Sequence, residues 1–511
     1  MNRLGKLTAF LFLAMAANSV LAAGRASHVV VVVWDGMRPD RVTRELTPTL
    51  FDLANEGVTF KNHHAAYIST TIVNGTTLAT GGYPQANGII ANREFRPAIN
   101  DSKSVASESI EAVRKGDELT RNHYISLPTV AELLQQSGRR TVVASTKTVG
   151  LLFDRAARGT NTTDVTLFAG VTLPESCGSD LSHACGQFPN TQTNRDDWTT
   201  SALIGPLWAD GVPAYSLLWL SEPDYTQHQT APGSPASLAA MRRSDANLAR
   251  VLAALDERKV REKTDVIIVS DHGFSSYYEM PNVLAALQRQ GVRAFAEKPD
   301  DARPGDVMVA MVGASVLLYV TDGRAADVEE VVRLLQAQSF SGVIFTKEAI
   351  SGTFALRDAR IQSADAPDIV VSFRWSADKN SHGVTGFIAS DTKTSGRERG
   401  THGSLSPFEM HNTCIAAGPD FRRGVQSHLP SGNVDIAPTI LWIMGVKPKQ
   451  KLSGRVLTEA LAGENPATIK FQPQRLEATH QGEGFTWRQY LNFSEVNGVV
   501  YFDEGNGSQS R

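Results

Sequence analysis

Two short runs of β-branched apolar residues most constrain the fold of this chain. They span residues 29–33 and 266–269, and every residue in them is valine or isoleucine. A strand with one face in water alternates apolar and polar side chains, so an unbroken apolar run indicates a strand that is buried on both faces. Strands of this kind are typical of parallel sheets that are covered by helices on both sides.

Helical segments alternate with strand-like segments along most of the chain. The segment 46–55 begins with Thr47-Pro48, an N-cap residue followed by proline at the first helical position. We expect helices over 46–55, 129–137, 234–258, 435–444 and 457–461, and further strands over 140–144 and 412–417. This alternation predicts an α/β fold, a three-layer αβα sandwich with a mostly parallel central sheet.

Two segments interrupt the alternation. Residues 93–126 are polar and irregular, and we interpret them as a surface insertion. Residues 276–396 carry a pattern of their own, with helices expected over 281–290 and 326–338 and strands over 314–319 and 342–346. This pattern predicts a smaller α/β cap inserted into a core made of 23–275 and 397–465. Residues 466–511 form a C-terminal extension with alternating, strand-like stretches.

The N-terminus has the three parts of a secretory signal peptide. Arg3 and Lys6 are basic, 7–17 is apolar, and 20–22 is a cleavage site of small residues. This apolar segment of eleven positions is too short for a membrane span of about 20 residues. We therefore expect removal of residues 1–22 rather than a retained anchor, and a periplasmic or secreted protein.

The charge balance gives no sign of nucleic-acid binding. The formal net charge is −3, and removal of two basic residues with the signal peptide makes it −5. No duplex-binding function is expected at this charge. The sequence carries no signal for the oligomeric state.

Three cysteines remain after export. Cys177 and Cys185 lie eight positions apart in a segment with glycine and serine, which we interpret as a loop. In an oxidising compartment this spacing is compatible with a local disulfide, but spacing alone does not establish the geometry, so both states stay open. Cys414 lies in an apolar segment and is expected to be a buried thiol.

Aspartates and histidines follow the two apolar runs. Asp35 comes after the first run, and Asp271 and His272 come after the second. In open α/β sheets, ligands bind at the carboxyl ends of the strands, where these residues would lie. Carboxylate oxygen and imidazole nitrogen together suit zinc.

Two further segments offer the same ligand types. Asp224 and His228 are four residues apart, which places them on one face of a helix, although a loop is equally compatible with the sequence. His402 lies between glycines in Gly400-Thr-His-Gly403. Each of these residues alone is more typical of a turn or a solvated surface. Their joint occurrence predicts two metal sites.

A hydroxyl-rich segment around Thr71 precedes a short helical stretch. N-cap hydroxyls and free backbone N–H groups at such a position suit a phosphate group. Thr71 could simply be a helix cap. A threonine hydroxyl is a poor nucleophile unless a metal lowers its pKa, so a catalytic Thr71 requires the metal sites.

Seven short motifs occur along the chain in a fixed order. They are Trp34-Asp-Gly-Met-Arg38, Thr47-Pro-Thr-Leu50, Leu78-Ala-Thr-Gly-Gly-Tyr-Pro84, Gly88-Ile-Ile-Ala-Asn92, Glu222-Pro-Asp224, Ser270-Asp-His-Gly273 and Thr401-His-Gly403. Together they resemble the alkaline phosphatase superfamily, in its type I phosphodiesterase/nucleotide pyrophosphatase branch. The resemblance extends over roughly residues 28–96, 127–148, 203–275 and 399–462.

The resemblance implies a set of site residues. It implies two zinc ions, or other divalent metals, bound by Asp224, His228 and His402 at the first site and by Asp35, Asp271, His272 and the nucleophile Thr71 at the second. Members of the family also place an asparagine 21 positions after the nucleophile to bind a phosphoryl oxygen, and Asn92 stands at that offset. Lys147 resembles the lysine with which some phosphomonoesterases of the superfamily bind the additional phosphate charge.

Some positions depart from the family pattern. The nucleotide-cleaving members follow the threonine with an aromatic residue, where this chain has Ile72. An arginine expected two positions after Lys147 is replaced by Val149. The segment that sulfatases convert to formylglycine is absent from the sequence. A strand-end lysine such as Lys147 is also a common surface residue.

The resemblance therefore implies a secreted two-metal hydrolase of small-molecule phosphate esters that acts through a phosphothreonine intermediate. A phosphodiesterase or nucleotide pyrophosphatase is the first interpretation, and a phosphomonoesterase of the alkaline phosphatase type is the alternative. A noncatalytic exported binding protein is the third, and it is disfavoured because the whole set of ligands is present together with Thr71.

Overall fold

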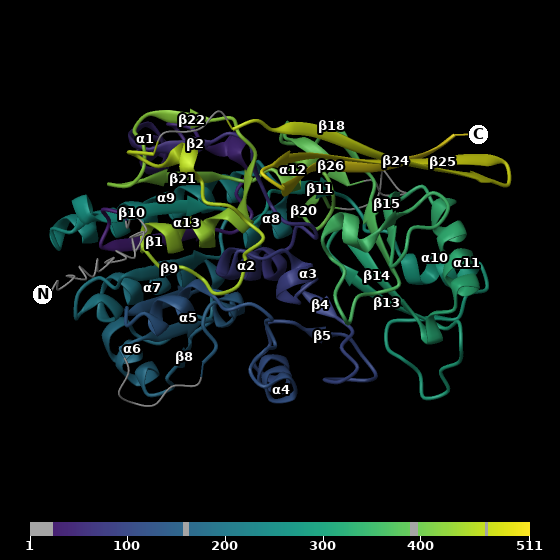
Figure 1. Cartoon of the computed structure of the whole chain (residues 1–511), viewed down its shortest axis with the longest axis horizontal. Helices are drawn as coiled ribbons and strands as arrows, with labels where there is room; N and C mark the ends of the chain where they lie inside the picture. The colour runs from purple at the N-terminus through teal and green to yellow at the C-terminus, as the bar shows by residue number, and fades with distance from the viewer. Residues whose placement is uncertain (1–23, 157–162, 389–396, 465–468, 511) are drawn as a thin grey trace, which may run out of the picture.

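The computed structural model describes residues 24–156, 163–388, 397–464 and 469–510 of the chain (Figure 1). The signal peptide expected at 1–22 lies outside the described residues. Among the described residues, none of the helices combines the length and the apolar character that a membrane crossing requires.

A nine-stranded sheet forms the centre of the larger half of the molecule (Figure 1). Its strands lie in the order β22 (Val425–Ser427), β2 (Val58–Phe60), β21 (Cys414–Ala417), β10 (Thr264–Val269), β1 (His28–Trp34), β9 (Tyr215–Leu220), β6 (Thr141–Ser145), β7 (Val165–Phe168) and β8 (Val171–Leu173). The five consecutive strands from β10 to β7 are parallel, whereas β21 and β8 are antiparallel to their neighbours. The mostly parallel sheet predicted from the two apolar runs is confirmed.

Alternate side chains of β1 enter two separate hydrophobic cores. Val29, Val31 and Val33 pack on one face of the sheet, and the residues between them pack on the other. The first core includes residues of α2 (Thr71–Thr80), α5 (Val130–Gln136) and α13 (Ile436–Ile443), and the second includes residues of α1 (Pro48–Glu56), α7 (Gln192–Ile204) and α9 (Pro235–Glu257). Each fully buried valine or isoleucine contributes about 1.5–3 kcal/mol. The apolar runs therefore place β1 and β10 in the middle of an αβα sandwich.

A second, six-stranded sheet lies beside the first (Figure 1). Its order is β12 (Ala294–Phe295), β13 (Val307–Val312), β14 (Ser315–Val320), β17 (Ile369–Phe373), β15 (Ser341–Thr346) and β16 (Phe354–Ala355). The same part of the chain forms α10 (Val283–Arg289) and α11 (Ala325–Gln336). The helices and strands expected between residues 276 and 396 are therefore present.

The C-terminal residues form a three-stranded antiparallel sheet. Its strands are β24 (Gln472–Gly482), β25 (Phe485–Val496) and β26 (Val499–Ser510), the yellow elements in Figure 1. Trp487 packs in the core of the second sheet, whereas Val496 and Tyr501 pack against Val73 of α2. The C-terminal sheet therefore contacts both halves of the molecule.

Two local expectations need correction. Cys177 and Cys185 are the first and last residues of the helix α6 (Cys177–Cys185), and both are free thiols. Eight helical steps of 1.5 Å separate them by about 12 Å along the axis, which is beyond the reach of a disulfide. The glycine and serine content suggested a loop, but buried Leu181 holds this segment as a helix against the core. The helix expected over 457–461 is a single 3₁₀ turn, Thr458–Ala460.

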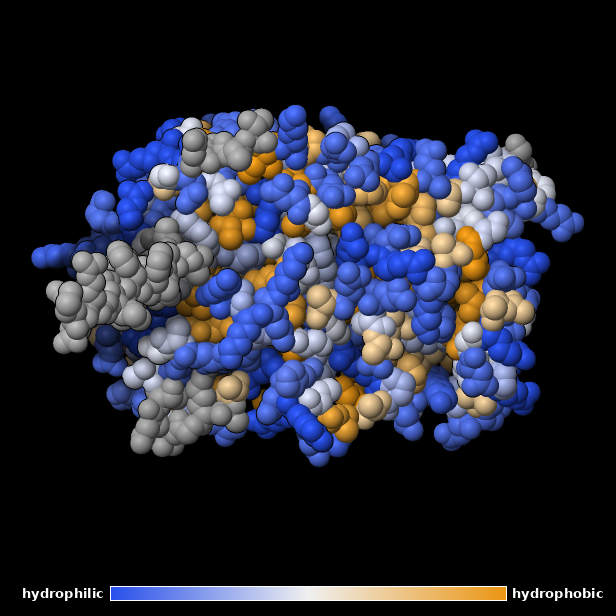
Figure 2. Space-filling view, in the orientation of Figure 1, coloured by the Kyte–Doolittle hydropathy of each residue, from blue (hydrophilic) through white to orange (hydrophobic). Residues whose placement is uncertain are grey.

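Figure 2 shows the hydropathy of one face of the molecule. Hydrophilic residues cover most of this face, and hydrophobic residues form small patches between them.

The segment 93–126 folds into β4 (Arg93–Glu94), β5 (Val105–Ala106) and α4 (Ile110–Thr120), and Leu119 is among its exposed side chains.

Candidate active site

The carboxyl ends of three adjacent strands supply the first group of site residues. Asp35 follows β1, Asp271 and His272 follow β10, and Asp224 begins α8 (Asp224–Thr230) after β9. Because β10, β1 and β9 are parallel neighbours, these ends meet at one edge of the sheet. The helix α8 also decides the question left open for Asp224 and His228, which are one helical turn apart.

A small sheet brings His402 to the same edge. The strands β11 (Ser275–Tyr277) and β20 (Arg399–Thr401) pair antiparallel, with Ser275 opposite Thr401. His272 lies shortly before the first of these strands and His402 directly after the second. Their rings stack with centroids 3.6 Å apart and planes 13° from parallel.

The six side chains form two clusters of three. In the first, Asp224 Oδ1 lies 3.2 Å from His228 Nε2 and 3.4 Å from His402 Nε2. In the second, His272 Nε2 lies 3.2 Å from Asp271 Oδ2 and 3.6 Å from Asp35 Oδ1. Within each cluster the nitrogen and oxygen atoms lie within 4.8 Å of one another.

The hydrogen bonds of the three histidines fix which ring nitrogen faces the carboxylates. Each Nδ1 lies 2.9 Å from a backbone carbonyl oxygen, that of Gly400 for His228, of Gly273 for His272 and of Ser69 for His402. A carbonyl oxygen only accepts, so each Nδ1 donates, and in the neutral ring Nε2 keeps its lone pair. A lone pair that faces a carboxylate oxygen is repulsive, and either a proton on Nε2 or a metal ion between the two atoms removes that repulsion. Metal-binding histidines have this arrangement.

In each of the three carboxylates, one oxygen accepts a hydrogen bond and the other faces the cluster. One oxygen of each is held by a donor: Trp219 Nε1 donates to Asp35 Oδ2 at 2.8 Å, Gly36 N to Asp271 Oδ1 at 3.0 Å, and Lys147 Nζ to Asp224 Oδ2 at 2.6 Å. The other oxygens, Asp35 Oδ1, Asp224 Oδ1 and Asp271 Oδ2, are buried and have no hydrogen-bond partner among the described residues. Burying an unpartnered carboxylate oxygen is costly. The donor set and the unpartnered oxygens therefore fit a pair of divalent cations.

Electrostatics favour positive charge at this edge of the sheet. Burial, together with the negative charges of Asp224 and Asp271, raises the pKa of Asp35 well above its ordinary value. Burial lowers the pKa of His272, but Asp271 and the other carboxylates outweigh burial and raise that pKa to about 9. A field that holds a proton on a buried imidazole also attracts a metal ion, which displaces the proton.

Thr71 lies beside the second cluster. It is the first residue of α2, and its Oγ1 atom lies 3.3 Å from His272 Nε2. Asn92 is fixed next to it, because the backbone N–H of Ile72 donates to Asn92 Oδ1 at 3.0 Å. The amide oxygen of Asn92 is thereby occupied, and its NH₂ group is the part that remains to bind a ligand.

Lys147 joins the two clusters. It follows β6, and its Nζ lies 2.6 Å from Asp224 Oδ2 and 2.8 Å from Asp35 Oδ2. Burial lowers the pKa of Lys147, but Asp224, Asp35 and Asp271 outweigh burial and raise the pKa above its ordinary value. The side chain is therefore charged and belongs to the site rather than to the open surface.

Two supporting residues could not be predicted from the sequence. Trp219 lies in an apolar strand and reads as a core residue, yet its indole N–H holds Asp35. The buried Glu409 accepts a hydrogen bond from the backbone N–H of Ser404 at 2.6 Å, which fixes the loop after His402. A third cluster of His64, His411 and Asp503 was also missed; the adjacent pair His63-His64 was the only local signal for it.

Comparisons with known proteins extend these observations. The sequence pattern of the family described as type I phosphodiesterase/nucleotide pyrophosphatase matches residues 29–405. Bis(5'-adenosyl)-triphosphatase enpp4 of Xenopus laevis is 24% identical over 250 residues, which is 48% of this chain and 47% of that protein. The match therefore covers less than half of the frog protein's length.

Two further relatives match over most of the chain. Human ectonucleotide pyrophosphatase/phosphodiesterase family member 7 is 21% identical over 432 residues, 84% of this chain and 82% of the human one. The structure of murine ectonucleotide pyrophosphatase/phosphodiesterase 5, in an inactive threonine-to-alanine form in complex with AMP, superposes with a TM-score of 0.59 at 19% identity. It covers 85% of this chain and 100% of the murine one, and at this identity it establishes the fold alone.

Proposed function

Because the chain belongs to the type I phosphodiesterase/nucleotide pyrophosphatase family, a family of phosphoric ester hydrolases, we propose that it is an exported two-metal phosphodiesterase with Thr71 as the nucleophile. One observation carries the proposal. The Nε2 lone pairs of three histidines and the unpartnered oxygens of three buried carboxylates converge beside a threonine hydroxyl.

The residues present would hold two zinc-class ions. One would be bound by Asp224, His228 and His402, and the other by Asp35, Asp271 and His272. When bound, such a pair supplies Lewis acidity for the ester and lowers the pKa of a nearby hydroxyl.

Thr71 then performs the covalent step. Its Oγ1 attacks phosphorus, the ester oxygen leaves as an alcohol or alkoxide, and a phosphothreonine forms. Water attacks the phosphothreonine in the second step and regenerates the Thr71 hydroxyl. The position of Thr71 at the start of α2 supports this role, because the positive end of a helix favours the phosphoryl group.

Asn92 and Lys147 would stabilise the negative charge of the phosphoryl group. The NH₂ group of Asn92 donates to an equatorial oxygen of the transition state. Lys147 keeps Asp35 and Asp224 close together, and it contributes positive charge where the two clusters meet.

The substrate class we propose is a small-molecule phosphodiester. The murine neighbour was solved with AMP, so a nucleotide ester is the obvious member to test. Ile72 is buried directly after Thr71 and offers no aromatic ring for a nucleobase to stack on. We therefore do not restrict the proposal to nucleotides.

A phosphomonoesterase is the second candidate, and the position of Lys147 is the observation that favours it. A monoester carries about two negative charges at neutral pH and a diester carries one. A lysine at the junction of the two clusters is well placed to bind the additional charge.

The deciding experiment compares three substrates on the zinc-loaded protein. These are bis-p-nitrophenyl phosphate, p-nitrophenyl phosphate and the p-nitrophenyl ester of thymidine 5′-monophosphate. We expect higher kcat/KM for the diesters than for the monoester. A higher value for p-nitrophenyl phosphate would replace the proposal with the second candidate, and no turnover of any of them would leave a binding protein.

Export is a separate part of the proposal. Fractionation of the producing cells and N-terminal sequencing of the mature protein test it. We expect a mature chain that begins at Ala23 outside the cytoplasm, and an intact Met1 would contradict export with cleavage.

A further inference from the structure

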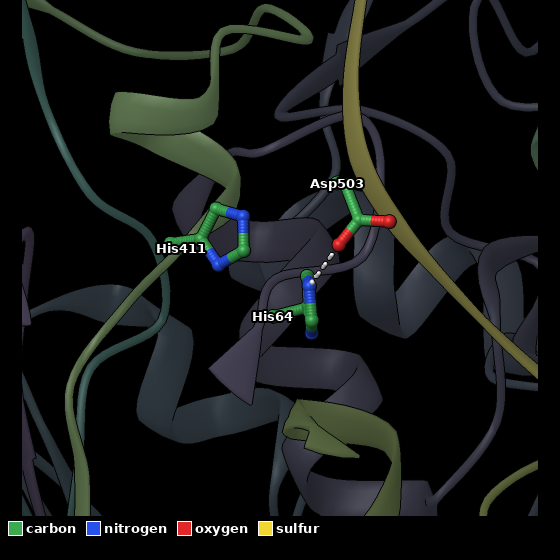
Figure 3. Close-up of side chains that lie close together, drawn as sticks. All are labelled: His64, His411 and Asp503. Carbon is green, nitrogen blue, oxygen red and sulfur yellow. Dashed lines mark hydrogen bonds and ion pairs between the residues drawn. The ribbon is translucent and has the colours of Figure 1, made fainter. Parts of the chain in front are cut away.

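A third cluster of potential metal ligands lies away from the candidate active site. His64 ends β3 (His63–His64), His411 follows α12 (Pro407–Met410), and Asp503 belongs to β26 of the C-terminal sheet. Their nitrogen and oxygen atoms lie within 4.8 Å of one another. Figure 3 shows the three side chains converging, with the His411 ring beside the contact between His64 and Asp503.

His64 has the same hydrogen-bond arrangement as the histidines of the active site. Its Nδ1 donates to the backbone oxygen of Ser431 at 2.9 Å, and its Nε2 lies 3.0 Å from Asp503 Oδ1. The parallel pairing of Ser431 with His63 fixes the carbonyl that receives this bond. In a neutral ring, the Nε2 lone pair of His64 therefore faces a carboxylate oxygen, as in the two catalytic clusters.

Asp503 and His411 are also oriented for a ligand. Ser494 Oγ donates to Asp503 Oδ2 at 3.1 Å, which leaves Oδ1 facing His64. The centroids of the His411 and His64 rings are 4.5 Å apart. One ring nitrogen of His411 lies within 4.8 Å of the ligand atoms of His64 and Asp503, so His411 can supply the third ligand.

The cluster is reachable from solvent. A surface pocket of about 460 Å³ is lined by residues that include His411, Asp503, Pro407 and Arg475. The Asp503 side chain is 27% exposed, whereas His64 is 1% exposed and forms the buried end of the cluster. An ion could therefore enter from the pocket and retain a water molecule on that side, as metal sites with three protein ligands do.

We propose that His64, His411 and Asp503 bind a divalent ion of the zinc class that fastens the C-terminal sheet to the catalytic core. Two imidazoles and one carboxylate are a ligand set that zinc and neighbouring transition metals accept. The alternative is a metal-free ion pair between protonated His64 and Asp503, and the experiments below separate the two.

The position of the cluster gives the ion a structural role. Ala65, next to His64, donates its backbone N–H to Met410 at 2.7 Å, and Gly273 and Phe274 donate theirs to Glu409 and Phe408. The segment before Thr71 and the segment after His272 are thus both attached to α12. An ion that joins His411 to Asp503 would hold β26 against α12 and the two segments attached to it. Binding of the ion would stabilise the native state by mass action.

The first test is metal content. Full-length protein is equilibrated in a zinc buffer, dialysed and analysed for zinc per chain. We expect Asp503→Asn and His411→Gln each to contain one ion fewer than the wild type. Glu504→Gln is the matched control, because the neighbouring carboxylate accepts from Tyr490 and Asn492 instead, and it should keep the wild-type content.

The comparison does not depend on the proposed catalytic function. A double variant, Asp224→Asn with Asp271→Asn, disables the catalytic clusters and should retain one ion. Addition of His411→Gln to this variant should remove that ion. Wild-type zinc content in both Asp503→Asn and His411→Gln would overturn the proposal.

The second test uses the unmodified protein and so does not depend on the folding of a variant. Diethyl pyrocarbonate modifies accessible histidines with a free lone pair, and mass spectrometry locates the modified residues. We expect metal-free protein to be modified at His411, and zinc to reduce that modification at least about tenfold. Equal modification of His411 with and without zinc would favour the metal-free ion pair.

Discussion

The rings of His272 and His402 stack face to face, 3.6 Å between centroids, although 129 residues separate them in the chain. Each belongs to a different cluster of three ligands. The two clusters are therefore adjacent, and their separation depends on the pairing of β11 with β20. A substrate that bridges the clusters would contact both at once.

This arrangement predicts separable metal sites. Asp224→Asn removes the charge that faces His228 and His402, so we expect the variant to bind one zinc ion fewer than the wild type while the cluster of Asp271 still loads. Its phosphodiesterase activity should fall at least about a hundredfold, because each ion stabilises developing charge in the transition state. Zinc analysis and turnover of bis-p-nitrophenyl phosphate measure the two effects.

Chelation provides the companion measurement. Dialysis against a chelator should abolish activity, and zinc should restore it. Asp306→Asn is the matched control for Asp224→Asn. Its carboxylate pairs with Arg293 at 2.8 Å and lies outside the three clusters, so this variant should keep the wild-type zinc content and activity. Full activity in metal-free protein would contradict the two-metal mechanism.

A nucleophilic Thr71 predicts a large loss of turnover on removal of its hydroxyl. We expect Thr71→Ala to lower kcat at least about 10³-fold and to leave zinc content and Tm close to wild type. Thr71→Ser should retain activity, because serine presents the same oxygen. Single-turnover kinetics with detection of a phosphorylated chain check the intermediate directly.

Thr70 is the matched control for this experiment. Its Oγ1 is buried and has no hydrogen-bond partner among the described residues. Thr70→Val preserves the shape of the side chain and should keep kcat within a few-fold of wild type. A near-normal kcat in Thr71→Ala would mean that water attacks phosphorus directly and that Thr71 only begins the helix.

The central sheet could be predicted from sequence because its signal is local. The all-apolar runs at 29–33 and 266–269 are fully buried strands, and the residues that follow each run lie where parallel strands end. The contacts of Lys147 could not be predicted, since they depend on three strands, β6, β1 and β9, being neighbours. The sequence indicated a lysine at the end of a strand, and its resemblance suggested a phosphate-binding role, but neither predicted the contacts with Asp35 and Asp224.

Two other features could not be predicted because they also depend on contacts between distant segments. The composition of 177–185 suggests a loop, whereas the segment is a helix that packs Leu181, Cys177 and Cys185 on the core. The cluster of His64, His411 and Asp503 is assembled from three distant segments, and no spacing along the chain marks it. Long-range packing decides these features, and a single sequence does not contain it in readable form.

A buried acid pair predicts how stability depends on pH. Burial and the neighbouring charge of Asp420 raise the pKa of Asp265 to about 8. An unfolded aspartate has a pKa of about 3.9, so between about pH 4 and pH 8 the folded state binds more protons than the unfolded state. The contribution of Asp265 to stability is therefore largest at the acidic end of this range and falls as the pH rises towards 8.

Asp265→Asn tests this dependence. The amide oxygen can still accept from the backbone N–H of Asp420, as Asp265 Oδ1 does at 3.1 Å, and the amide cannot ionise. We expect the free energy of unfolding, measured in urea, to fall less between pH 5 and pH 8 than in the wild type, by on the order of 1–3 kcal/mol. Parallel pH curves for the two proteins would show that Asp265 does not carry this proton.

Lys147 predicts how the enzyme distinguishes substrate charge. Removal of its charge should harm a monoester more than a diester, because the monoester carries about one additional negative charge at neutral pH. We expect Lys147→Ala to lower kcat/KM for p-nitrophenyl phosphate at least about tenfold, which is roughly 1.4 kcal/mol, and to lower it less for bis-p-nitrophenyl phosphate.

The contacts of Lys147 also provide a way to recognise a purely structural role. Its Nζ lies between Asp35 and Asp224, one carboxylate from each cluster, so a lysine that only positions these ligands would change zinc content when removed. Equal losses of kcat/KM on both substrates, with less zinc bound, would assign Lys147 to the support of the metal ligands. A wild-type preference for monoesters that disappears in Lys147→Ala would instead make the phosphomonoesterase the better assignment. The absence of an arginine at Val149 leaves Lys147 as the single cation of the expected pair, and a diester, with its single charge, is the substrate that such a site suits.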